Sequence, residues 1–295
     1  MKYDMLSIGN LSLDFNIDYL DNQVVEVGGA VMYSTAAGVA GGYKVGAVTK
    51  ANPKDKDRLD KFVIPKQDVF YVPSLHSTSI RNKYFTADKE RRLCTCLGQA
   101  EGFTIEDIPS VETSVYHFAG LIYGDFDGEL IKALSFKGKT AVDVQGLLRK
   151  RNYQNEEMYF EDWADKKTYF PYVDFLKTDT AEAEILTGQK DRFKAAEMFL
   201  SWGAKEVVIT NSAEVLAAND KELKTVPIRA RNLSGRSGRG DTTFGAYVTK
   251  RLDSNLSDSL LWATAMVSAK MEKIGPYLGN KQDVENYIKE FYKDF

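Results

Sequence analysis

A glycine-rich segment that leads into a helical pattern is the part of the sequence best suited to chemistry. Residues 229–248 begin polar and glycine-rich, with Gly235, Gly238 and Gly240, and apolar side chains then recur at three- and four-residue steps. A glycine loop that opens a helix leaves the first backbone N–H groups unpaired, and such groups bind anions. Four arginines precede Asp241 in this segment, so we expect a polyanionic ligand such as a nucleotide triphosphate there. These arginines are Arg229, Arg231, Arg236 and Arg239.

Asp241 lies at the mouth of the predicted anion site, where its charge would repel a bound phosphate. This placement calls for a function, and removing the proton from an attacking hydroxyl group is one. The alternative is that Asp241 only caps its helix, because Asp is favoured in the first helical turn.

A second candidate binding region lies near the N-terminus. Met5–Ile8 is an apolar run that predicts a buried strand, and Asp14 lies just beyond it, where open α/β sheets bind ligands. A carboxylate can accept two hydrogen bonds from neighbouring hydroxyl groups, which suits a sugar or polyol. Residues 27–42 add paired glycines, which let a ligand approach the backbone, and small residues, which let a helix pack closely. The alternative for Asp14 is an ordinary solvated charge on a strand.

Short apolar runs alternate with amphipathic stretches from residue 45 onward, which predicts βαβ units and a largely parallel sheet flanked by helices. Residues 77–97 break this alternation and predict two strands around Asp88, that is, a hairpin. Strands are expected at Val45–Val48, Val69–Val72, Val115–Phe118, Thr140–Asp143, Val173–Leu176 and Val207–Thr210, and helices at Asp127–Phe136, Asp191–Trp202 and Leu256–Met271.

The bulk composition limits the class of protein. The chain has 295 residues, 43% of them hydrophobic, which is ordinary for a globular α/β domain. A net charge of −3 gives no general attraction to nucleic acid or to a membrane surface. The two cysteines, Cys94 and Cys96, are expected to be free thiols, and with two histidines we expect no zinc site. Because we find no signal peptide or membrane span, we expect a cytoplasmic protein.

Three motifs occur in the order of one known family. Ser237–Ala246 resembles the second signature of the ribokinase-like, or PfkB, carbohydrate kinases, and the glycine pair at 28–29 resembles their first. Lys177–Gly188 resembles the family motif Asn-x-x-Glu, with Asp179 at the Asn position and Glu182 at the Glu position. The resemblance implies a ribokinase-like α/β fold over residues 1–295, with a small β-sheet lid at about 11–27 and 77–98. In this family the lid covers the substrate and often mediates dimerisation.

The resemblance also implies an activity, which is phosphoryl transfer from ATP, with Mg²⁺, to a hydroxyl group of a small sugar or polyol. Asp241 is then the general base, and the loop of Gly238, Arg239 and Gly240 forms the anion hole, in which the backbone N–H groups of Arg239, Gly240 and Asp241 stabilise the charge on the transferred group. The acceptor would bind to Ser12, Asp14, Gly28, Gly29 and Tyr33. The nucleotide would contact Asp179, Thr210, Ala265 and Ser268, with its purine close to the small residues Ala265 and Ser268, and Glu182 would hold the metal through water.

Several positions depart from the family pattern. Tyr33 replaces a common Asn, Arg239 replaces Ala, and the glycines usual after Thr210 are absent. Gly235 and Arg236 replace an acid and a Thr, so we do not predict a monovalent-cation site. Tyr33 and the runs at residues 91–98 and 143–149 look more like the inositol-kinase branch than like ribokinase or fructokinase. A nucleoside kinase of the same family and a catalytically silent sugar- or nucleotide-binding regulator are the alternatives.

Overall fold

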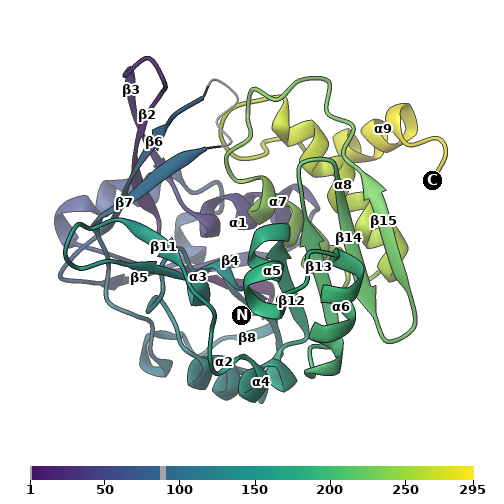
Figure 1. Cartoon of the computed structure of the whole chain (residues 1–295), viewed down its shortest axis with the longest axis horizontal. Helices are drawn as coiled ribbons and strands as arrows, with labels where there is room; N and C mark the ends of the chain where they lie inside the picture. The colour runs from purple at the N-terminus through teal and green to yellow at the C-terminus, as the bar shows by residue number, and fades with distance from the viewer. Residues whose placement is uncertain (1, 87–90) are drawn as a thin grey trace.

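A nine-stranded sheet forms the centre of the molecule, and helices cover both of its faces (Figure 1). The computed structural model describes residues 2–86 and 91–295. Seven strands run parallel, whereas β14 and β15 at one edge run antiparallel to their neighbours. The order across the sheet is β15 (Leu223–Pro227), β14 (Glu214–Asn219), β13 (Glu206–Thr210), β12 (Phe175–Asp179), β9 (Lys139–Asp143), β8 (Glu112–Phe118), β1 (Lys2–Ile8), β4 (Val45–Ala51) and β5 (Val69–Pro73).

Alternating side chains of the sheet enter two separate hydrophobic cores. On β1, Met5 packs on one face, and Leu6 and Ile8 pack on the other. This arrangement explains why the parallel strands are apolar along their whole length. The first face packs on α1 (Ala30–Ala40), α7 (Arg239–Lys250), α8 (Leu256–Met271) and α9 (Lys281–Phe291); the second packs on α2 (Gly128–Ser135), α3 (Gln145–Leu148), α5 (Thr180–Thr187) and α6 (Arg192–Ser201), with α4 (Lys166–Tyr169) at its rim.

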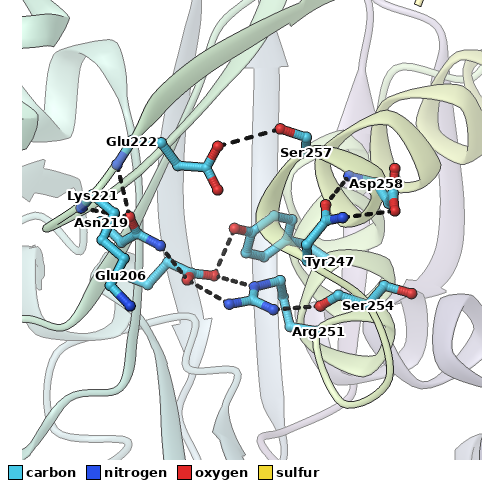
Figure 2. A network of polar contacts seen from close by, with 10 residues as sticks. Glu206, Asn219, Lys221, Glu222, Tyr247, Arg251, Ser254, Ser257 and Asp258 are labelled. Carbon is cyan, nitrogen blue, oxygen red and sulfur yellow. Dashed lines mark hydrogen bonds and ion pairs between the residues drawn. The ribbon is translucent and has the colours of Figure 1, made fainter.

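A polar network fixes the C-terminal end of α7 to the sheet (Figure 2). The carboxylate of Glu206 on β13 accepts a hydrogen bond from the Tyr247 hydroxyl at 2.6 Å. It also accepts two hydrogen bonds from the guanidinium of Arg251, at 2.8 and 3.0 Å. Tyr247 is fully buried. These hydrogen bonds therefore hold the C-terminal end of α7 on the sheet, opposite to the glycine-rich start of the helix.

A separate small sheet stands beside the main one and contains both segments expected to form the lid (Figure 1). Its order is β3 (Gln23–Gly28), β2 (Ser12–Ile17), β6 (Thr78–Tyr84) and β7 (Arg92–Gly98). A short hairpin of β10 (Arg149–Arg151) and β11 (Met158–Phe160) extends it, because Cys96 N donates to Glu156 O at 2.9 Å. The turn expected around Asp88 lies outside the described residues.

Most of the predicted elements are present, with shifted ends. The strand expected at Val173–Leu176 begins two residues later, because Phe170–Tyr172 forms a 3₁₀ turn before it. Cys94 and Cys96 are free thiols, as expected. The hairpin β14–β15 and helix α9 had no counterpart among the expected elements. Within the described ranges, none of the helices has the length and apolar character needed to cross a bilayer. The remaining 3₁₀ segments are Pro53–Lys61, Lys66–Asp68 and Ile105–Asp107.

Candidate active site

The start of α7 has the geometry of an anion-binding site. Gly238 caps the helix in a left-handed conformation, with φ 74° and ψ 15°, and no side chain caps the helix. A Cβ atom at this position would lie 2.2 Å from the Tyr33 ring, so only glycine fits. The N–H of Arg239 donates to Arg236 O at 3.2 Å, whereas those of Gly240 and Asp241 have no acceptor within residues 2–86 and 91–295. Two of the three amides expected in the anion hole therefore remain open to a ligand.

One cavity of about 120 Å³ brings the two signature regions together. Asp241 and Gly238 from the start of α7 line it, and Asp14 from β2 lines it as well. Four further predicted residues lie in or beside this cavity, namely Ser12, Gly29 and Tyr33 on its wall and Gly28 next to Asp14. The structure thus places the expected base and the expected acceptor-binding residues around one space. Their roles remain predictions.

The paired glycines make room for the Asp14 carboxylate. A Cβ atom on Gly28 would lie 2.5 Å from Asp14 Oδ2, and Gly29 has a φ of +118°. The Oδ1 atom of Asp14 is buried and has no hydrogen-bond partner within the described residues. Burial is the main reason why the pKa of Asp14 is raised. An unpaired buried carboxylate oxygen that faces a cavity is suited to accept a hydrogen bond from a ligand hydroxyl.

Polar side chains that we did not predict complete the cavity. Arg92 from the small sheet and Arg149 from β10 both line it, and Arg149 is buried with its Nε donating to Leu121 O at 2.6 Å. Carboxylates and guanidinium groups therefore surround the same space. The sequence could have indicated Arg92 and Arg149 as cavity residues, because both lie in the runs that resemble the inositol-kinase branch. The other unpredicted polar residues on the wall are Asn16, Glu26, Asn82, Tyr84, Gln145 and Ser237.

A buried lysine lies beside the first turn of α7. Lys177 Nζ is 2.9 Å from Asp143 Oδ2, and a Cβ atom on Gly240 would lie 3.1 Å from the same ammonium. Burial opposes the charged form of Lys177, but the carboxylates of Asp143 and Glu182 raise its pKa above the ordinary value. A fixed positive charge next to the open amides strengthens the site for an anion.

The pKa of Asp241 is raised to about 6, first because the side chain is desolvated and then because Asp143 is near. A carboxylate with this pKa is ionised at neutral pH and is a stronger base than an ordinary Asp. Its position next to the open amides and to the cavity fits proton removal. Helix capping alone does not explain why the cavity opens at this residue.

Asp179 and Glu182 form a capping box at the start of α5. Glu182 N donates to Asp179 Oδ1 at 2.8 Å, and Asp179 N donates to Glu182 Oε2 at 2.7 Å. Burial raises the pKa of Glu182 to about 8. In the described part of the chain, no three His, Cys, Asp or Glu side chains are grouped so that they could hold a metal ion directly. The two acids fit Mg²⁺ only as acceptors for its bound water molecules.

Three of the residues predicted to contact the nucleotide are buried, and the C-terminal segment covers one of them, Ser268. Ala265 and Ser268 on α8 are fully buried. The Ser268 hydroxyl lies 2.8 Å from the Tyr292 hydroxyl and donates to Thr264 O at 2.7 Å. Thr210 is also buried, at 2% exposure. A purine would have to displace Tyr292 to reach Ser268 in this conformation.

Two of the four arginines expected near the anion lie elsewhere. Arg229 forms a bidentate ion pair with Asp294, with both distances 2.6 Å. Arg231 pairs with Glu272 at the end of α8. Acids distant in the sequence therefore neutralise these two arginines, and they do not add to the positive charge that we expected near the anion. Arg236 and Arg239 remain at the start of α7.

A second, larger cavity adjoins the first. It measures about 460 Å³ and lies between the small sheet and the loop before α7. Both cavities share Tyr33, Tyr84, Asn16, Glu26 and Ser237 on their walls. A ligand larger than a single ring could therefore extend from one into the other.

The chain is similar to known proteins over most of its length. The family model for pfkB family carbohydrate kinases matches residues 68–283. A cytidine kinase from Thermococcus kodakarensis is 25% identical over 257 residues, which is 83% of this chain and 87% of that protein. A sulfate complex of a pyrophosphate-dependent kinase in the ribokinase family is 29% identical, with a TM-score of 0.86, and covers 95% of this chain and 99% of its own. A complex of a pyrophosphate-dependent kinase in that family with a pyrophosphate analog and myo-inositol is 28% identical, with a TM-score of 0.84 and the same coverage.

Proposed function

This chain belongs to the pfkB family of carbohydrate kinases, and we propose that it transfers a phosphoryl group from pyrophosphate to a hydroxyl group of myo-inositol or a polyol of similar size. The observation that supports this proposal best is the shared cavity of Asp241 and Asp14, with two open amides at its edge. The proposed activity is one of the activities expected of sugar and nucleoside kinases of the ribokinase family.

The composition of the acceptor cavity supports a neutral polyol. Asp14 and Glu26 can accept hydrogen bonds from ring hydroxyl groups, and Arg92 and Arg149 can donate to them. A ring with a hydroxyl group on every carbon satisfies both kinds of partner at once. An apolar acceptor would leave the buried Oδ1 atom of Asp14 without a donor, at a cost of about 1–3 kcal/mol.

The chemical step follows from the position of Asp241. The ionised carboxylate accepts the proton of the acceptor hydroxyl, and the hydroxyl oxygen then attacks the terminal phosphorus of the donor. The bond between that phosphorus and the bridging oxygen breaks, and orthophosphate leaves. The N–H groups of Gly240 and Asp241, with the Lys177 ammonium beside them, stabilise the charge on the transferred group.

We also propose that the Arg239 side chain adds positive charge to the transferred group, as an arginine finger supplied within the chain does. A lower kcat in Arg239→Ala supports this role. An unchanged kcat means that Arg239 only forms a surface contact, worth about 0–1 kcal/mol.

Two observations support a donor without a nucleoside. Ser268, which we expected to contact a purine, is buried under Tyr292. Two of the similar solved structures are of pyrophosphate-dependent kinases. ATP, the donor implied by the sequence motifs, is the competing candidate.

Magnesium fits the site as a partner of the donor phosphates. Asp179 and Glu182 would hold its water molecules, and the ion would neutralise negative charge on the donor when it is bound. The acids stand at the end of β12, next to Lys177.

The small sheet would act as a lid and as a dimer contact. Its inner side lines the acceptor cavity, whereas Val25, Leu93 and Leu97 are 47%, 37% and 40% exposed. Exposed apolar side chains on a sheet are suited to pairing with a second copy of the chain. Chain mass measured in solution by light scattering tests this part of the proposal.

The experiment that tests the function is a matrix of donors and acceptors. The purified protein is incubated with Mg²⁺ and either pyrophosphate or ATP, together with myo-inositol, other inositols, hexoses, ribose or nucleosides, and phosphate monoesters are quantified by ³¹P NMR. We expect monoester formation with pyrophosphate and myo-inositol. Turnover of cytidine instead would favour the nucleoside kinase, which the larger adjoining cavity and the cytidine kinase relative support. Ligand binding without transfer in every combination would favour the silent regulator.

A further inference from the structure

The loop before α7 is fastened to α8 through backbone atoms. Gly235 N donates to Met271 O at 2.7 Å. The ammonium of Lys270 donates to Gly235 O at 2.5 Å and also to Ser237 O. These contacts fix the three residues that precede Gly238, the cap of α7. The path of this loop decides where the open amides of α7 point.

The surroundings of Lys270 are unusual for a lysine. The residue is 2% exposed, yet in residues 2–86 and 91–295 its ammonium donates to carbonyl oxygens and forms no ion pair with a carboxylate. Buried lysines are rare and are normally paired with an acid. The neighbours of this ammonium are instead two carbonyl oxygens and the face of the Tyr33 ring, whose centroid is 5.0 Å away.

Carbonyl oxygens that converge on a positive charge form the type of cradle in which proteins bind monovalent cations. Ammonium and potassium ions have similar sizes, and an ammonium group tethered to α8 requires no ion from solution. The Tyr33 ring contributes a third favourable contact, because the face of an aromatic ring attracts cations. Burial opposes the charge and lowers the pKa of Lys270 to about 8, whereas Asp241 and Glu26 favour the charge from a distance.

Loss of the ammonium would leave two carbonyl oxygens facing a cavity without a donor. Gly235 O and Ser237 O would then turn toward water, which costs less than leaving them unpaired. Gly235 packs tightly against the backbone of Lys273, since a Cβ atom on Gly235 would lie 1.7 Å from Lys273 O. Its carbonyl group therefore has no room to turn while the rest of the loop stays in place. The whole loop would move, and Gly238 would move with it.

We propose that Lys270 is a positioning residue whose ammonium acts as a built-in monovalent cation and holds the carbonyls of Gly235 and Ser237, so that the amides of Gly240 and Asp241 face the phosphoryl donor. This proposal rests on the proposed function, because it assumes that a phosphate group binds at the start of α7. It implies that the activity does not depend on added potassium or ammonium ions.

The test is removal of the ammonium and its replacement from solution. In Lys270→Ala we expect kcat/KM for the donor to fall about 100-fold, the effect of a misplacement of about 1 Å at a reacting group. Methylammonium should restore at least a tenth of the lost activity, and tetramethylammonium at the same ionic strength should not. Exchange of K⁺ for Na⁺ should leave the wild type unchanged.

Lys250→Ala is the matched control, because Lys250 lies on α7 and pairs with the exposed Asp253. It should keep full activity with every cation. An unchanged kcat/KM in Lys270→Ala below its melting temperature would overturn the proposal, as would equal rescue by both ammonium ions. If Lys270→Ala does not fold, Lys270→Met is measured in its place, since it keeps the apolar stem.

Binding of methylenediphosphonate, measured by calorimetry, separates this proposal from the proposed function. A wild-type protein that binds the analogue but transfers no phosphoryl group contradicts the kinase. Weaker binding by the Lys270 variant, with recovery in methylammonium, would still support the positioning role. Equal binding by both proteins would overturn it.

Discussion

Lys177 and Asp143 form a buried ion pair of 2.9 Å on neighbouring parallel strands, directly beside the first turn of α7. Both side chains are almost fully buried, at 7% and 3% exposure. Removing one member of such a pair leaves an uncompensated charge in a medium of low dielectric constant. The pair therefore contributes to the stability of the fold and supplies positive charge to the site.

Lys177→Met should lower the free energy of unfolding by about 3–5 kcal/mol, because Asp143 then loses its partner. Lys205→Met is the matched control, since Lys205 pairs with Asp174 at 2.7 Å but is 65% exposed on its side chain. An exposed pair contributes about 0–1 kcal/mol. Urea unfolding of the two variants measures both values, and equal losses would contradict the buried pair.

Asp241→Asn should lower kcat at least about 100-fold without unfolding the protein, because general-base catalysis contributes about 10²–10⁴ in rate. Asp258→Asn is the control, since Asp258 occupies the same position in the first turn of α8. If Asp241 only caps its helix, both variants will lose about 1 kcal/mol of stability and little activity. Steady-state kinetics and thermal unfolding distinguish the two outcomes.

The pH dependence of kcat/KM should report the raised pKa of Asp241. The base works only when it is ionised, so the activity should fall about tenfold per pH unit below pH about 6, rather than below the ordinary value of 3.8. Asp241→Asn has no group that ionises there, and its residual activity should lack this acidic limb. A wild-type profile that stays flat down to pH 4.5 would exclude Asp241 as the base.

The acid, glycine and strand patterns that are local in sequence could be predicted, whereas contacts between distant segments could not. Asp241 begins a helix at the edge that strand ends and helix starts of an α/β sheet share, whereas Asp14 and Gly28 lie on the small sheet, whose first strand directly follows β1 in the chain. Tyr292 covers Ser268 and Asp294 pairs with Arg229 across 24 and 65 residues of chain, and no spacing rule indicates either contact.

The unpredicted cavity residues depend on strand register. Asn82 lies opposite both Asn16 and Cys94 in the small sheet, which turns it toward the cavity. A shift by one residue would turn it to the outer face. Alternation along β6 indicates that its two faces differ, but the register that selects the inner face is set by pairing with β2 and β7.

Asp14→Asn should raise KM for the acceptor and leave KM for the donor unchanged. A hydrogen bond to a charged group contributes about 1.5–3 kcal/mol, which corresponds to about 10–150-fold in affinity. The buried and unpaired Oδ1 atom of Asp14 is the expected acceptor of that bond. Equal changes in both KM values would mean that Asp14 shapes the cavity rather than binding the acceptor.

Arg251→Met tests whether the far end of α7 serves stability alone. The substitution removes two hydrogen bonds to Glu206 and one to Ser254 O, and leaves the Glu206 carboxylate with Tyr247 as its main partner (Figure 2). We expect a loss of about 1.5–3 kcal/mol in the free energy of unfolding. Lys250→Met, which removes a pair with the exposed Asp253, should cost about 0–1 kcal/mol.

Because the network lies at the end of α7 opposite to Gly238, kcat and both KM values of Arg251→Met should stay unchanged well below the melting temperature. A fall in kcat as large as that in Asp241→Asn would show instead that this network positions the catalytic end of the helix.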